Sequence, residues 1–188
     1  MPRSTPKILS PYDIATLERA ALDYAARYAT TRAKLAAYLR RKLRERGWEG
    51  DSPPPVEALV ERFAERGYVD DRAFATARAD SLLRRGYGVR RIAMALRTAG
   101  IDAETSGALC GRIDAGAEQA AMLYARRKRI GPFAGRRPDV TEKRRWIAAM
   151  ARAGHPLDLV LRVLGGEPEE EEVDNPHFPG NGGYPVSE

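Results

Sequence analysis

An amphipathic helix that ends in glycine occurs three times in this chain at almost constant spacing. The pattern is an apolar residue, a second apolar residue four positions later, and a glycine four positions after that. It occurs as Leu39, Leu43 and Gly47, as Ile92, Leu96 and Gly100, and as Trp146, Met150 and Gly154. The three glycines lie 53 and 54 residues apart. Such a period predicts a tandem array of helical units, each stabilised by its neighbours.

Each copy of the pattern occupies the same place in a repeated order of elements, with a longer helix before it and a short apolar helix after it. We therefore expect an all-α fold of three tandem three-helix repeats that form an elongated, curved molecule. Any three amphipathic helices that end in glycine would share the motif alone, so the prediction depends on the constant period. The predicted division is a flexible arm over 1–12, repeats over 13–69, 70–114 and 115–165, and a disordered acidic tail over 166–188.

The composition favours helix throughout. Hydrophobic residues make up 43% of the chain, with alanine the most frequent of them, and no segment alternates apolar and polar residues as a strand would. Glycine, proline and capping residues delimit the elements, with Asp70 or Asp71 predicted to cap one helix and the loop from Trp48 to Pro55 predicted to be non-helical. The predicted helices cover roughly residues 14–28, 31–46, 56–66, 71–85, 89–98, 103–113, 117–129, 141–153 and 156–164.

Charge is distributed unevenly along the chain. The net charge is +6, but all 32 Lys and Arg residues precede Gly165, and the segment after this glycine is dominated by acidic residues. The body therefore carries +13 and the tail −7. A body this basic predicts a polyanionic or acidic partner. A general preference for arginine in the composition would explain single arginines, although it explains their clustering less well.

Three basic clusters are the candidate binding residues. A solvated helix face would account for any one of these side chains, but the second helix of each repeat carries much of the charge, so stacking would align it along one side. Such a surface suits phosphates or an acidic protein groove. The predicted partner-binding or DNA-binding residues are Arg40, Arg41, Lys42, Arg44, Arg84, Arg85, Arg90, Arg91, Arg97, Arg126, Arg127, Lys128, Lys143, Arg144 and Arg145.

No residue pattern predicts catalysis. The chain has one cysteine, Cys110, and two histidines, His155 and His177, none at the spacing of a metal site or a nucleophile with its base. Asp70 and Asp71 could be paired carboxylates, but their position directly before a helix favours capping. We therefore expect no enzymatic activity, metal or cofactor. No apolar run approaches a membrane span and no signal core is visible, so the prediction is a cytoplasmic protein that does not bind membranes.

The central residues resemble a known family. The segment from Gly67 to Ala75, GYVDDRAFA, is similar to the central signature of RecX, a regulator of the RecA recombinase. The segment from Arg84 to Ile101, with its Gly-Tyr-Gly turn, resembles the rest of that signature, and the likeness extends over roughly residues 14–165. After Gly154 this chain has His155 and Pro156, where the family more typically has an aromatic residue.

The resemblance implies a function and partners. It implies an all-helical, non-catalytic protein that binds in the groove of the RecA–single-stranded DNA filament and inhibits the recombination, ATPase and coprotease activities of RecA. It also implies that the basic clusters supply the contacts to RecA, to DNA or to both. We expect a monomer that acts in DNA repair, recombination and the SOS response. The alternative is a stand-alone helical protein that binds nucleic acid without a recombinase.

Overall fold

The computed structural model describes residues 10–165. The predicted disordered tail over 166–188 and the first nine residues of the predicted arm lie outside the described residues. The described part contains helices and no β-strand, which confirms the all-α prediction. The elements are α1 (Ile14–Arg27), α2 (Arg32–Arg46), α3 (Val56–Glu65), α4 (Asp71–Arg84), α5 (Val89–Thr98), α6 (Ala103–Gly107), α7 (Cys110–Lys128), the 3₁₀ helix η1 (Gly131–Phe133), α8 (Val140–Arg152) and α9 (Leu157–Leu164).

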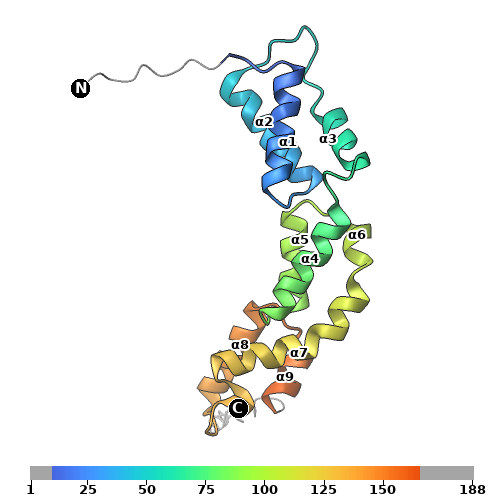
Figure 1. Cartoon of the computed structure of the whole chain (residues 1–188). Coiled ribbons are helices and arrows are strands. Elements are labelled where there is room, and N and C mark those ends of the chain that lie inside the picture. The colour runs from blue at the N-terminus through green and yellow to red at the C-terminus, as the bar shows by residue number, and fades with distance from the viewer. Residues whose placement is uncertain (1–9, 166–188) are drawn as a thin grey trace, which may run out of the picture.

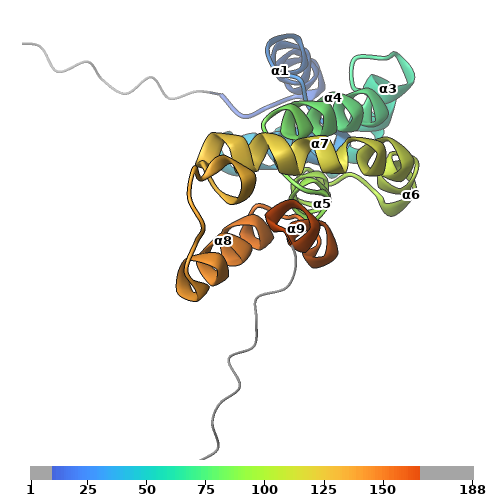
Figure 2. The ribbon, with the colours of Figure 1, turned by 90° about the horizontal axis from the view of Figure 1, so that it is seen from below.

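The molecule is an elongated, curved array of three helical units (Figure 1). In that view α2, α5 and α8 follow one edge of the array, and α3 and α6 lie on the opposite edge. A view along the array shows α1, α4 and α7 together on one side, with α8 and α9 on the other (Figure 2). Each unit has its own hydrophobic core, as expected of a repeat protein whose units contact only their neighbours.

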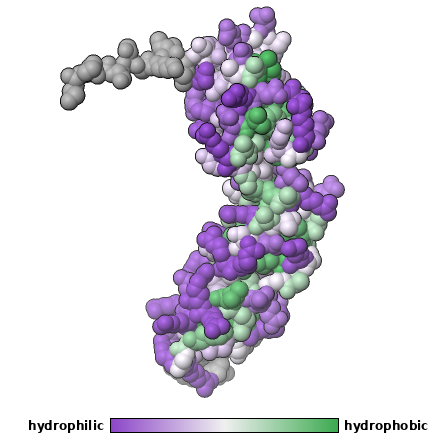
Figure 3. Space-filling view, viewed as in Figure 1, coloured by the Kyte–Doolittle hydropathy of each residue, from purple (hydrophilic) through white to green (hydrophobic). Residues whose placement is uncertain are grey.

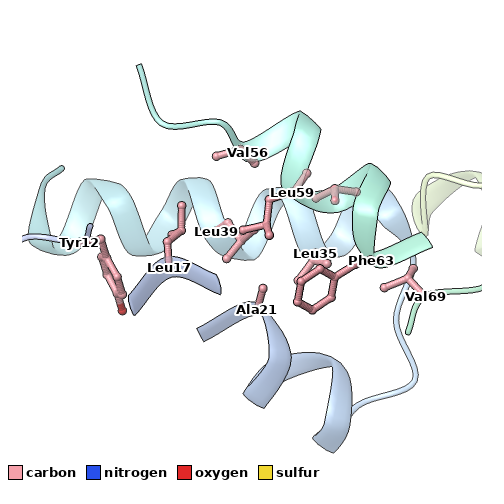
Figure 4. Packing of buried hydrophobic residues seen from close by; sticks show 11 residues of the cluster. Tyr12, Leu17, Ala21, Leu35, Leu39, Val56, Leu59, Phe63 and Val69 are labelled. Carbon is pink, nitrogen blue, oxygen red and sulfur yellow. The ribbon is translucent and has the colours of Figure 1, made fainter. Parts of the chain in front are cut away.

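The core of the first unit forms where α1, α2 and α3 meet. Leu17, Leu35, Leu39 and Phe63 have 2% or less of their surface exposed, and their side chains converge between the three helices (Figure 4). Local signals start the helices. Asp13 forms a capping box with Thr16 at the start of α1, and the Thr31 hydroxyl accepts the Lys34 amide proton at the start of α2. The other buried residues of this first core are Tyr12, Ala21, Ala36, Val56, Leu59, Val60 and Val69.

The end of the predicted arm is part of this first unit. Tyr12 is buried, and its amide donates to the Gly47 carbonyl oxygen at 3.0 Å. The Glu49 amide in turn donates to the Tyr12 carbonyl oxygen at 2.9 Å, and the Arg46 guanidinium lies 4.1 Å from the centre of the Tyr12 ring. Residues 10–12 therefore attach the chain to the loop that follows α2.

One continuous helix joins the second and third units. We predicted a helix ending near Ile113 and another beginning near Ala117, but α6 ends at Gly107 and α7 runs unbroken from Cys110 to Lys128, so these predictions were wrong. Helix α7 spans the predicted boundary between residues 114 and 115. Its glycine at 116 costs helix propensity, yet it lets Leu83 of α4 pack closely, because a Cβ there would lie 3.1 Å from the Leu83 Cδ1 atom.

The first and second units meet where α5 ends against the start of α2. The Thr31 hydroxyl, which caps α2, also donates to the Ala99 carbonyl oxygen at 2.6 Å in a buried contact. The two adjacent aspartates act as caps: Asp70 caps α4, and Asp71 accepts the Arg32 amide proton of α2 at 2.9 Å. Both aspartates therefore cap helices, as their position at the start of α4 favoured, and Asp71 caps a helix of the neighbouring unit.

The second and third units meet where α8 ends against the start of α5. No side chain caps α5; instead, the Gly88 amide donates to the Ala153 carbonyl oxygen and the Arg90 amide to the Gly154 carbonyl oxygen, each at 3.0 Å. The contact is so close that a Cβ on Gly88 would lie 2.3 Å from the Gly154 carbonyl carbon. Glycine is required at this position because two backbones touch there.

The glycine at 88 gives a first test of this joint. Its φ of −84° suits any residue, so the cost of Gly88→Ala is steric alone. We expect it to lower the free energy of unfolding by about 1–3 kcal/mol, as overpacking typically does. Gly111→Ala is the matched control. A Cβ at 111 meets nothing within 4 Å inside α7, so alanine should stabilise by up to about 1 kcal/mol. Urea titrations followed by circular dichroism measure both, and equal effects would contradict the joint as described.

His155 lies buried at the same joint, with none of its surface exposed. Its Nε2 lies 3.2 Å from the Gly86 carbonyl oxygen, to which the neutral ring donates, and its Nδ1 has no hydrogen-bond partner among the described residues. Burial lowers the pKa of the imidazole from its ordinary 6.5, and the bond to Gly86 opposes this only in part. Protonation would place a charge where nothing described neutralises it.

The lowered pKa of His155 predicts a stability that depends on pH. The unfolded chain takes up the proton more readily than the folded one, so this contribution is complete above the ordinary pKa and is lost as the pH falls through 6.5. His155→Gln keeps an amide donor near the Nε2 position and cannot titrate. The loss of unfolding free energy between about pH 7.5 and about pH 5.5 should be larger for the wild type than for this variant. Parallel losses in the two proteins would rule out His155 as the cause.

Candidate functional site

The cations of α2, α5 and α8, together with Arg85 in the turn before α5, form what we call the basic column. The three helices follow one another end to end along one edge of the molecule (Figure 1). Hydrophilic side chains cover most of the face seen in that view, with smaller apolar areas over the upper and lower parts of the molecule and at its narrow middle (Figure 3). Helix contacts therefore place three basic helices that are distant in the sequence end to end along one edge.

The cations at the end of the column formed by α2 are largely neutralised within the unit. Arg40 pairs with Glu57, while Arg41 and Lys42 both pair with Glu45, at 3.7 and 2.9 Å. The hydrogen bond with Lys42 lowers the pKa of Glu45 and raises that of Lys42, and the bond from Arg40 lowers the pKa of Glu57. Arg44 is exposed on the same helix. These pairs leave less free charge here than the sequence indicates.

The cations in the middle of the column have no such partners. Arg85, Arg90, Arg91 and Arg97 are exposed, and none forms an ion pair with a carboxylate of residues 10–165. The guanidinium groups of Arg85 and Arg91 lie 5.5 and 5.8 Å from the centre of the Tyr87 ring. Unpaired guanidinium groups remain available to bind an anion from outside.

Arg84 lies on a different side of α4 from its neighbour Arg85. It lines a cavity between α4 and α7 together with Asp80 and Arg112, which form a bidentate pair at 2.8 and 2.9 Å. The hydrogen bond that Arg112 donates to Asp80 raises the pKa of Arg112. The structure therefore separates Arg84 from the other predicted arginines of the Gly-Tyr-Gly turn.

The cations of the last unit divide between α7 and α8. Arg126, Arg127 and Lys128 are exposed in the last turn of α7, where cations oppose the helix dipole. Arg127 also has a structural contact, since it donates to the Arg85 carbonyl oxygen at 2.7 Å across the joint between units. On α8, Arg144 and Arg145 are exposed and Lys143 is half-buried beside the end of α9.

A groove between α4 and α5 gathers cations from two units. This α4–α5 groove has a volume of 350 Å³ and begins at the first turn of α2. Two of its cations, Lys34 and Arg78, were not among the predicted site residues. Arg78 follows Phe74 by four positions on α4, so helical spacing places the two on one face, a signal the sequence did contain. The groove is lined by Lys34, Phe74, Arg78, Leu82, Arg85, Tyr87, Arg91, Met94, Ala95, Thr98 and Ala99.

Side chains that could bind a metal ion or act as a nucleophile are sparse in the part of the chain that the structure describes. Within residues 10–165 no three His, Cys, Asp or Glu side chains are grouped so that they could hold a metal ion, and Cys110 is exposed with a free thiol. None of the helices described here is both long and apolar enough to cross a membrane.

Comparison with known proteins gives consistent relatives. The family model for the second three-helix domain of RecX matches residues 70–106, which include α4, α5 and the glycines of the central turn. Regulatory protein RecX from Myxococcus xanthus is 35% identical over 172 residues, which cover 87% of this chain and 90% of that protein. Regulatory protein RecX from Mycobacterium sp. strain JLS is 36% identical over 166 residues, which cover 83% and 88%.

A solved structure agrees with the fold. The crystal structure of RecX from Lactobacillus salivarius superposes with a TM-score of 0.65 over 80% of this chain and 94% of that one. At 15% identity this likeness supports the arrangement of the helices and nothing finer. The family itself follows from the sequence relatives, which are similar over most of both chains: this protein belongs to the RecX family of regulatory proteins.

Proposed function

We propose that this protein is a non-catalytic regulator of the RecA recombinase, which binds in the groove of the RecA–single-stranded DNA filament and inhibits its ATPase, strand-exchange and coprotease activities. The observation that carries the proposal, beside family membership, is the middle of the basic column. There Arg85, Arg90, Arg91 and Arg97 are exposed without carboxylate partners in residues 10–165. Cations arranged this way attract a polyanionic surface and increase the rate of encounter with it.

The shape of the molecule supports the same proposal. Three units in a curved row present a long, narrow edge to a partner. Such an edge fits the groove of an extended filament better than a compact ligand would. We propose that the protein acts as a monomer in the cytoplasm, in DNA repair, recombination and the SOS response. No metal or cofactor enters the proposed mechanism, since binding and electrostatic attraction are its only steps.

Inhibition of RecA is the direct test. The purified protein should lower the DNA-dependent ATPase rate of RecA and slow strand exchange, because a ligand in the filament groove opposes both. No effect at several-fold excess over filament sites would reject the proposal. Affinities for naked single-stranded DNA and for the RecA-coated strand distinguish the alternative. Tighter, steeply salt-dependent binding to the naked strand would favour a stand-alone DNA-binding protein.

Charge reversal in the middle of the column tests which surface binds. The double variant Arg90→Glu, Arg91→Glu should weaken filament binding by about tenfold or more, because two attractive contacts become repulsive. The variant Arg27→Glu, Arg66→Glu is the control. It makes the same change in net charge at exposed residues of α1 and at the end of α3, which are not part of the column. Circular dichroism verifies folding, and equal losses in both variants would show that only net charge matters.

A further inference from the structure

The α4–α5 groove combines cations with apolar side chains, and binding phosphates would not require the apolar side chains. Its lining includes four cations, Lys34, Arg78, Arg85 and Arg91, and no carboxylate. Between them lie apolar side chains, of which Met94 has 55% of its surface exposed. An exposed methionine beside half-buried aromatic rings offers an adaptable apolar surface, which is typical of sites that accept a protein side chain.

Aromatic rings hold three of these cations in place. The Lys34 ammonium lies 4.5 Å from the centre of the Phe74 ring, and the Arg85 and Arg91 guanidinium groups approach the Tyr87 ring. Such contacts attract each cation to the ring and restrict where it can lie. A carboxylate that enters the groove therefore meets donors that are already positioned, so less entropy is lost on binding.

The same contacts argue against a nucleobase as the occupant. Proteins that bind single-stranded nucleic acid stack bases on open aromatic faces. Here cations already approach the faces of both rings, so a base could stack only by displacing them. Phosphates, for their part, would gain nothing from the apolar floor that Leu82 and Met94 provide.

The charges of the groove are also unsatisfied within the chain. None of its four cations forms an ion pair with a carboxylate of the described residues, in contrast with Arg40, Arg41 and Lys42 at the far end of α2. A partner that brings carboxylates would form charge-assisted hydrogen bonds, which are roughly twice as strong as neutral ones. Charge complementarity therefore specifies an acidic occupant, and the apolar floor specifies a bulky side chain beside the acids.

We propose that the α4–α5 groove binds a protein segment in which acidic residues flank one bulky apolar side chain. The apolar side chain fills the groove beside Met94, and the flanking carboxylates pair with Arg78 and Arg91 on either side and with Lys34. Because Lys34 belongs to the first unit and the other cations to the second, the bound segment bridges their joint. The proposal depends on the proposed function only for the identity of the protein that carries the segment.

A synthetic peptide tests the groove without RecA. The probe is a short fluorescent peptide with one phenylalanine between two pairs of glutamates, and the readout is fluorescence anisotropy with the full-length protein. Arg78→Gln and Met94→Ser should each weaken binding about tenfold or more, a change of about 1.4 kcal/mol. Arg66→Gln is the matched control, since it removes one exposed charge at the end of α3 and should leave the affinity unchanged. A peptide with serine in place of phenylalanine should bind the wild-type protein as weakly as the Met94→Ser variant binds the original peptide.

Several outcomes would overturn the groove proposal. They are no binding of the peptide to the wild type, equal binding of the phenylalanine and serine peptides, or equal losses in Arg78→Gln and Arg66→Gln. A fourth is a loss of oligo-dT affinity in Met94→Ser as large as the loss of peptide affinity, which would identify the groove as a nucleic-acid site instead. These results are independent of RecA inhibition, so failure of the proposed function and failure of the groove proposal are distinguishable.

Discussion

The structure depends on contacts between the end of one helix and the start of another. At each joint, the last carbonyl groups of one helix accept hydrogen bonds from groups at the start of the next: α8 against α5, and α5 against α2. Helix ends leave such groups unsatisfied, and a buried unsatisfied group is costly. Each joint satisfies the end of one helix and the start of another, and it aligns their dipoles head to tail.

This stacking also decides where charge can accumulate. Because α2, α5 and α8 continue one another, these three basic helices form one edge of the molecule. Acidic residues pair with only part of this edge: Glu45 and Glu57 neutralise cations of α2, whereas Arg90 and Arg91 at the start of α5 form no ion pair with an acid of the described chain. The fold determines where the basic helices lie, and nearby carboxylates determine which of their cations remain unpaired.

Local signals in the sequence predicted most of the helices, because periodicity, caps and terminal glycines act within a few residues. Predictions that required contacts between units did less well. Leu83 of α4 lies close to Gly116 within α7, and His155 is buried at the joint between α5 and α8. The α4–α5 groove was missed for the same reason, since Lys34 reaches it only after the first two units have stacked.

The two joints differ in the contacts that form them. Between the second and third units, α7 runs through continuously, and two backbone hydrogen bonds and the close approach of Gly88 to Gly154 complete the contact. Between the first and second units, the chain passes through a short turn, and side chains of Thr31 and Asp71 make the hydrogen bonds. The first joint therefore depends on side-chain hydrogen bonds, whereas the second shares a continuous helix. The α4–α5 groove lies across that joint, so a segment bound as proposed would contact both the first and the second unit.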